Sequence, residues 1–177
     1  NLIYSLNIIE GTGAVLEGTT LTITPSNNQF YSHQATISVS DGNGGFHSQD
    51  IIVTVESVND APETVDISES ILEETTITIN LIENTEDVDG EPSTFIYTIV
   101  QDAINGECFN NVDGTITYTP EEDYPFGEES GNDTCTYQAN DGEAQFSDSN
   151  ISTITITVTN ENDAPVLNNV LDVDFLE

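Results

Sequence analysis

The sequence predicts an all-β protein made of tandem antiparallel β-sandwiches. Apolar residues alternate with Thr in residues 76–79, 115–118 and 154–158, which is the period of strands that are buried on one face. Turn sequences rich in Gly, Asn and Asp separate such runs at intervals of about 8 to 15 residues, and no segment keeps a helical period. Short strands at this spacing are typical of sandwiches with roughly seven strands and about 100 residues.

An internal repeat sets the domain boundaries. The sequences VSDGNGGFHSQDIIVTVESVNDAP, ending at Pro62, and ANDGEAQFSDSNISTITITVTNENDAP, ending at Pro165, both run strand, Asp-Gly turn, strand and Asn-Asp-Ala-Pro. The two Asn-Asp-Ala-Pro motifs lie 103 residues apart, so the repeating unit is a whole domain. We therefore expect residues 1–60 to be the C-terminal part of one sandwich, 61–163 a complete sandwich, and 164–177 the first strand of a following or donated domain.

The charge of the chain is almost entirely negative. It holds 33 Asp and Glu residues but no Lys or Arg, which gives a formal net charge of -33 at pH 7. Nucleic acids and anionic membrane surfaces are therefore excluded as partners, and no apolar stretch approaches the roughly 18 residues of a membrane span. Because only His33 and His47 offer an internal cation, clusters of carboxylates favour hard cations from solution, with Ca²⁺ first.

The repeat resembles a known family. A strand, Asp-Gly-x-Gly-Gly, a second strand and Val-Asn-Asp-Ala-Pro, together with GTITYTPEEDY at residues 114–124, resemble the cadherin-like tandem repeats of large secreted bacterial adhesins and extracellular fibres. The resemblance implies immunoglobulin-like or cadherin-like sandwiches joined by calcium-binding linkers. It also implies an extracellular or cell-surface location, a structural and adhesive role without catalysis, and partners among neighbouring repeats, other copies, or cell-surface and glycan targets.

A first calcium site is predicted at the N-terminal end of the complete sandwich. If successive strands alternate in direction, an EDVDGE loop, the turn before the last strand and the incoming linker all lie at this end. The ligands expected from these three segments are Asn59, Asp60, Asp87, Asp89, Glu91 and Asp141. Together they offer the carboxylate and amide oxygens that calcium prefers.

A second calcium site is predicted at the opposite end of the same sandwich. Its expected ligands come from the first turn, from a loop that begins with Glu121 and Glu122, and from the outgoing linker. They are Glu73, Glu74, Asp123, Asn162 and Asp163. For any one of these acids, a solvated role in a turn stays open as an alternative.

Cys108 and Cys135 are the only cysteines, and both fall in the complete sandwich on strands expected to be neighbours. An even count in an acidic exported protein favours a disulfide, although two buried free thiols remain an alternative. The sequence contains no nucleophile elbow, His-centred triad or phosphate loop, so we expect no enzyme. A carbohydrate- or ligand-binding module of a secreted enzyme, and ice binding through Thr ladders, remain alternative functions.

Overall fold

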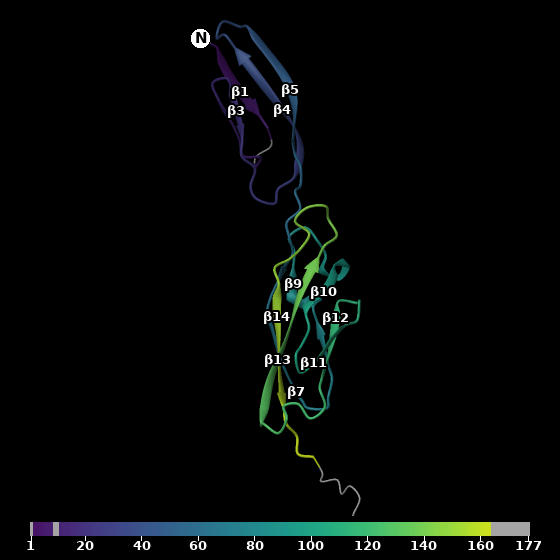
Figure 1. The fold of residues 1–177 in the computed structure, drawn as a ribbon. Coiled ribbons are helices and arrows are strands. Elements are labelled where there is room, and N and C mark those ends of the chain that lie inside the picture. Colours follow the sequence, from purple (N-terminus) through teal and green to yellow (C-terminus); the bar gives the residue numbers. More distant parts are fainter. Residues whose placement is uncertain (1, 9–10, 164–177) are drawn as a thin grey trace, which may run out of the picture. The chain divides into compact units, whose positions relative to one another are not determined.

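The computed structural model describes residues 2–8 and 11–163, which form two compact units that divide between Asn59 and Asp60 (Figure 1). The expected strand at residues 164–177 lies outside the described residues.

The first unit contains a three-stranded antiparallel sheet in the order β1-β4-β5 and a separate hairpin, β2-β3. The strands are β1 (Ile3–Asn7), β2 (Ala14–Glu17), β3 (Thr20–Ile23), β4 (Tyr31–Ser40) and β5 (Phe46–Val55). The Asp41 carboxylate closes the β4–β5 turn, since its Oδ1 accepts hydrogen bonds from the backbone N–H groups of Asn43 (2.7 Å) and Gly45 (2.9 Å). The buried apolar side chains of the described part of this unit are Ala35 and Val53.

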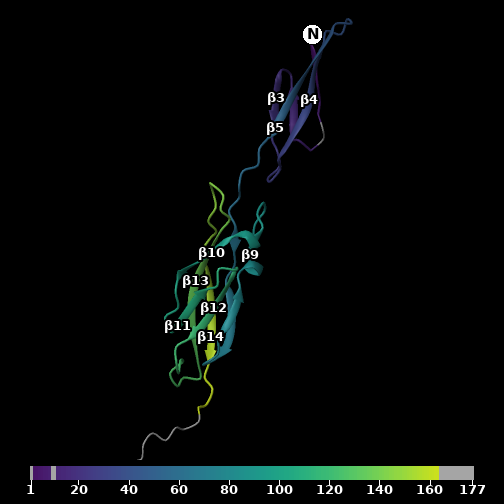
Figure 2. The same ribbon diagram turned by 90° about the vertical axis from the view of Figure 1, so that its right-hand side faces the viewer.

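The second unit is a β-sandwich whose first sheet has the order β10-β13-β14-β7 and whose second has the order β11-β12-β8 (Figure 2). The strands of the first sheet are β7 (Ile67–Leu72), β10 (Ile96–Gln101), β13 (Ser130–Asn140) and β14 (Ser152–Thr159). Those of the second are β8 (Ile77–Asn80), β11 (Gly106–Asn110) and β12 (Thr115–Pro120). A short pair, β6 (Glu63–Thr64) with β9 (Thr85–Glu86), and two 3-10 turns, η1 (Ile82–Asn84) and η2 (Pro92–Thr94), complete the unit.

The core of this sandwich follows the alternation predicted from the sequence. Residues 154, 156 and 158 of β14 and residues 116 and 118 of β12 are fully buried, while the Thr residues between them are half-buried. These inward side chains pack between the sheets with Tyr137 and Leu81. The prediction of an all-β sandwich is therefore confirmed.

Two connections bind the sandwich together in ways that the sequence pattern did not specify. β14 pairs with β7 in parallel, in a register that runs from Ile154 opposite Ile67 to Thr159 opposite Leu72, whereas the other paired strands of the described chain are antiparallel. The Cys108–Cys135 disulfide joins β11 of one sheet to β13 of the other, with the two Cα atoms 6.6 Å apart. The two cysteines are thus paired, but across the sheets and not on neighbouring strands of one sheet.

Candidate functional site

The candidate site is built around the turn that links β9 to η2. The Oδ1 atom of Asp87 accepts hydrogen bonds from the backbone N–H groups of Asp89 and Gly90, both at 2.9 Å. A Cβ atom at position 90 would lie 2.7 Å from the ring of the buried Phe95, so any residue other than glycine would force that ring to shift. The turn therefore holds the Asp87 carboxylate in one place against the end of the sandwich.

The second oxygen of Asp87 has no partner. Oδ2 is buried and accepts no hydrogen bond, and no other buried side-chain polar atom in the described part of the chain is left in this state. An unsatisfied buried oxygen is costly, more so when it carries negative charge. The position is chemically suited to a cation that arrives from solution.

Asp60 and Asp89 add negative charge at the same place. The backbone N–H of Asp60 donates to Oδ2 of Asp89 at 3.4 Å, which brings the start of the second unit to this turn. Partial loss of hydration raises the pKa of Asp89, and the neighbouring carboxylates of Asp87 and Asp60 raise it further. The chain has no Lys or Arg that could neutralise these carboxylates.

The other ligands predicted for this end are less closely engaged. Glu91 is exposed, and its backbone carbonyl accepts a hydrogen bond from the N–H of Thr94 at 2.8 Å. Asp141 is half-buried and accepts a hydrogen bond from the N–H of Glu143 at 2.8 Å, in the β13–β14 loop at the same end of the unit (Figures 1 and 2). Asn59 ends the first unit, so its placement relative to this turn is not part of the site geometry.

At the opposite end, Glu73 is the one predicted ligand that is buried, with 4% of its surface exposed. Its Oε1 accepts a hydrogen bond from the N–H of Glu161 at 2.5 Å, so this carboxylate already holds the chain that leaves β14. Glu74 and Asp123 are exposed and adopt left-handed backbone conformations, with φ of 59° for each. The remaining two predicted ligands, Asn162 and Asp163, are joined by a side-chain hydrogen bond from Asn162 to the Asp163 carbonyl at 3.0 Å.

Within the described ranges, no group of three or more Asp, Glu, His or Cys side chains lies close enough together to hold a metal ion. The donor chemistry of the Asp87 turn nevertheless fits calcium, because a buried oxygen of Asp87 lacks a partner beside the carboxylate of Asp89. The Glu73 end offers a weaker fit, since its buried carboxylate is already hydrogen-bonded.

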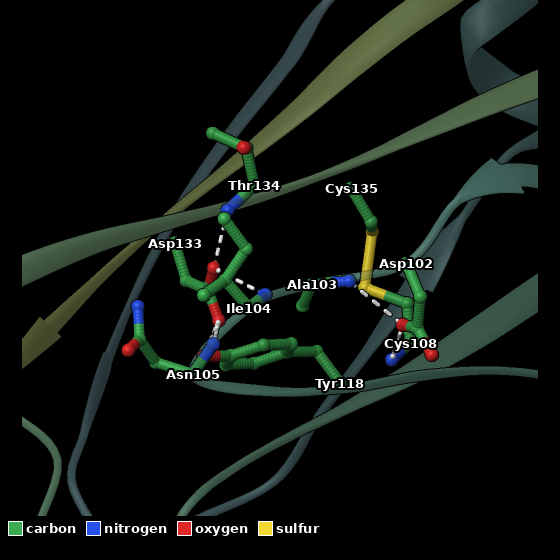
Figure 3. Close-up of a disulfide and its surroundings, with 9 residues drawn as sticks. All are labelled: Asp102, Ala103, Ile104, Asn105, Cys108, Tyr118, Asp133, Thr134 and Cys135. Carbon is green, nitrogen blue, oxygen red and sulfur yellow. Dashed lines mark hydrogen bonds between the residues drawn. A yellow bond between two sulfur atoms is a disulfide. The ribbon is translucent and has the colours of Figure 1, made fainter.

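A buried carboxylate that the sequence analysis did not single out lies beside the disulfide (Figure 3). Asp133 accepts hydrogen bonds from the N–H groups of Ile104 (3.0 Å), Asn105 (2.9 Å) and Thr134 (2.9 Å), and from the Tyr118 hydroxyl (3.1 Å). Burial raises the pKa of Tyr118, and the charge of Asp133 raises it further. Asp133 follows the inward alternation of Cys135 and Tyr137 along β13, and that period was the signal for its burial.

The two-sheet arrangement of the second unit defines a cadherin-like β-sandwich. Two solved structures similar to this chain are human protocadherin-24 EC1-2, with 17% identity and a TM-score of 0.55 over 92% of this chain and 83% of that one, and Drosophila N-cadherin EC1-4, with 14% identity and a TM-score of 0.54 over 91% and 41%. At these identities the likeness shows the fold alone.

A family model described as the bacterial cadherin-like domain matches residues 59–160. The chain therefore belongs to the bacterial cadherin-like domain family, as the resemblance of its repeats predicted. A search of curated proteins found no match. In the described part of the chain, no helix is long and apolar enough to cross a membrane.

Proposed function

We propose that this chain is a non-catalytic, calcium-stabilised repeat module of an extracellular bacterial adhesin or protein fibril. Membership of the cadherin-like family supports an adhesive repeat module, and the two copies of Asn-Asp-Ala-Pro support a tandem array. Its partners are adjacent repeats or further copies of the same chain, with cell-surface or glycan targets for adhesion. Its location is extracellular or at the cell surface.

The observation that carries the calcium part of the proposal is the unpartnered buried oxygen of Asp87. Asp87, Asp89 and Asp60 would hold the ion, and Glu91, Asp141 and Asn59 are the further ligands predicted from the sequence. Calcium supplies positive charge that relieves the repulsion among these carboxylates, and its six to eight oxygen ligands tie loops distant in sequence to one another. The result is a stiffer domain end.

Melting curves with a chelator and with millimolar calcium test this proposal. Calcium that binds only the folded state at about 100 times its Kd adds roughly 2.7 kcal/mol, which raises the Tm by roughly 10 °C in a protein of this size. In the double variant Asp87→Asn, Asp89→Asn we expect most of this increase to disappear.

Asp113→Asn is the matched control, because Asp113 is an exposed turn carboxylate outside the predicted ligand set that accepts two hydrogen bonds from Thr115. It should keep the full calcium response. A wild-type melting curve that is identical with chelator and with calcium would contradict the proposal.

A further inference from the structure

β7 and β14, the long strands nearest the two ends of the second unit, lie side by side and run in the same direction; only the two-residue strand β6, which pairs with β9, precedes β7. β7 pairs with β14 over six residues on each strand, from Ile67 opposite Ile154 to Leu72 opposite Thr159. The chain enters the unit ahead of β7 and leaves it after β14, at opposite ends of the sandwich (Figures 1 and 2). Tension along the chain therefore pulls β7 by its N-terminal end and β14 by its C-terminal end. The hydrogen bonds of a parallel pair are evenly spaced, so this geometry loads them together in shear.

Side chains extend the contact beyond the start of β7. The N–H of Thr64 donates to Oδ1 of Asn150 (2.9 Å), and the Asn150 amide donates back to the Thr64 carbonyl (2.8 Å). The Thr64 hydroxyl also contacts the Ser152 hydroxyl at 2.8 Å, and the N–H of Thr153 donates to Asp66 at 2.7 Å. Thr64 and Ser152 are buried, so water competes little for these bonds.

A further set of bonds extends the contact past the end of β7. The N–H of Glu73 donates to the Thr159 carbonyl at 3.0 Å, and the Glu73 carboxylate accepts from the N–H of Glu161 at 2.5 Å. The segment from Thr64 to Glu73 is thus bonded to residues 150–161 at Thr64, at Asp66, along β7 and at Glu73. We refer to this paired region, residues 64–73 with 150–161, as the terminal strap.

The disulfide lies between the two halves of the terminal strap in sequence. Cys108 and Cys135 are 27 positions apart, and both fall after β7 and before β14. The disulfide therefore carries no load while the strap is intact. Once the strap has broken, it prevents the segment between the two cysteines from extending.

We propose that the second unit is a load-bearing domain, in which the terminal strap resists tension and the Cys108–Cys135 disulfide limits extension after the strap breaks. This mechanical role goes beyond adhesion and needs no bound calcium. It predicts that resistance to force depends strongly on the direction of pulling.

Single-molecule force spectroscopy on the 177-residue chain in chelator tests the proposal. With handles at the two termini the strap is sheared. With the first handle moved to the exposed Glu74, just beyond the C-terminal end of β7, the strands are pulled from the same end and peel apart one bond at a time. We expect a several-fold higher rupture force in the terminal geometry, and equal forces in the two geometries would overturn the proposal.

Two further measurements use the same instrument. Reduction of the disulfide, which closes a loop of 27 positions, should lengthen the extension of the second unit by about 90 Å, at roughly 3.4 Å per released residue.

Asn150→Ala, which removes strap bonds, should lower the rupture force in the terminal geometry. Asn132→Ala removes a bond from Thr157 of β14 to β13 but no bond between residues 64–73 and 150–161, so it should leave the rupture force unchanged. An extension that does not change on reduction, or equal effects of the two Asn variants, would contradict the proposal. Loss of the calcium response alone would leave these results intact, so this test and that of the proposed function fail separately.

Discussion

Asp133 and Asp87 show two ways in which a chain without Lys or Arg accommodates a buried carboxylate oxygen. Asp133 is satisfied from within, by three backbone N–H groups and one hydroxyl. Asp87 receives two N–H groups on one oxygen and nothing on the other. The first arrangement suits a permanent structural anchor, whereas the second is the one on which the proposed calcium site rests.

Asp133→Asn should therefore destabilise the fold although it preserves the shape of the side chain. The amide nitrogen of the new residue would face N–H groups that now donate to a carboxylate, which costs about 2–3 kcal/mol in the free energy of unfolding. Urea unfolding in chelator measures this change. Asp113→Asn, at an exposed turn, is the control, and a loss for Asp133→Asn as small as the control's would show that the anchor contributes nothing.

Among the secondary-structure elements, β11 and β13 carry the one covalent link between the two sheets of the second unit. Cys108 and Cys135 are 5% and 1% exposed, so the link passes through the core. The Asp133 carboxylate, two residues before Cys135, also fixes the segment that leads into β11 through Ile104 and Asn105. Covalent and hydrogen-bonded constraints thus act on the same connection between the sheets.

Removal of both cysteines should lower the free energy of unfolding by about 3 kcal/mol, because a closed loop of this length restricts the unfolded chain. Urea unfolding of Cys108→Ala, Cys135→Ala measures the loss. A reducing agent should destabilise the wild type by a similar amount and leave the double variant unaffected. If the reductant shifts both proteins equally, the disulfide is not the cause.

The elements also show how far the sequence determines the structure. The alternation of Ile with Thr was sufficient to predict β8, β12 and β14, because period two directly reflects burial on one face. It did not predict the parallel pairing of β7 with β14, since periodicity states which face is buried but not which strands are neighbours. Periodicity also could not distinguish the buried Glu73 from the solvated acids around it, because the burial of Glu73 depends on its hydrogen bond to the N–H of Glu161.

Over the whole second unit, the acids gather in turns and at the ends of the sandwich. The four strands of the larger sheet contain two acidic residues, the half-buried Glu69 and the buried Asp133. The exposed residues of that sheet are therefore uncharged. The repulsion implied by a net charge of -33 over the chain is concentrated where the loops and linkers lie.

This distribution predicts a salt dependence that calcium suppresses. In chelator, an increase in NaCl from about 0.01 M to about 0.5 M shortens the Debye length from about 30 Å to less than 8 Å and should raise the Tm by screening the acids from one another. With saturating calcium the same increase in NaCl should produce a smaller shift, because the densest clusters are already neutralised. Thermal melts at matched pH measure both shifts. Equal shifts in the two conditions would show that calcium does not act on these clusters.

The buried disulfide has one more consequence, which concerns oxidative damage. The chain has no Met and no Trp, and both of its cysteines are consumed in the Cys108–Cys135 bond. Thiols and thioethers are the side chains that peroxides attack to form sulfenic acids and sulfoxides, and this protein presents neither. The only sulfur atoms of this chain are those of one disulfide in the core, so the packing of the sandwich contains no thiol or thioether that an oxidant could modify.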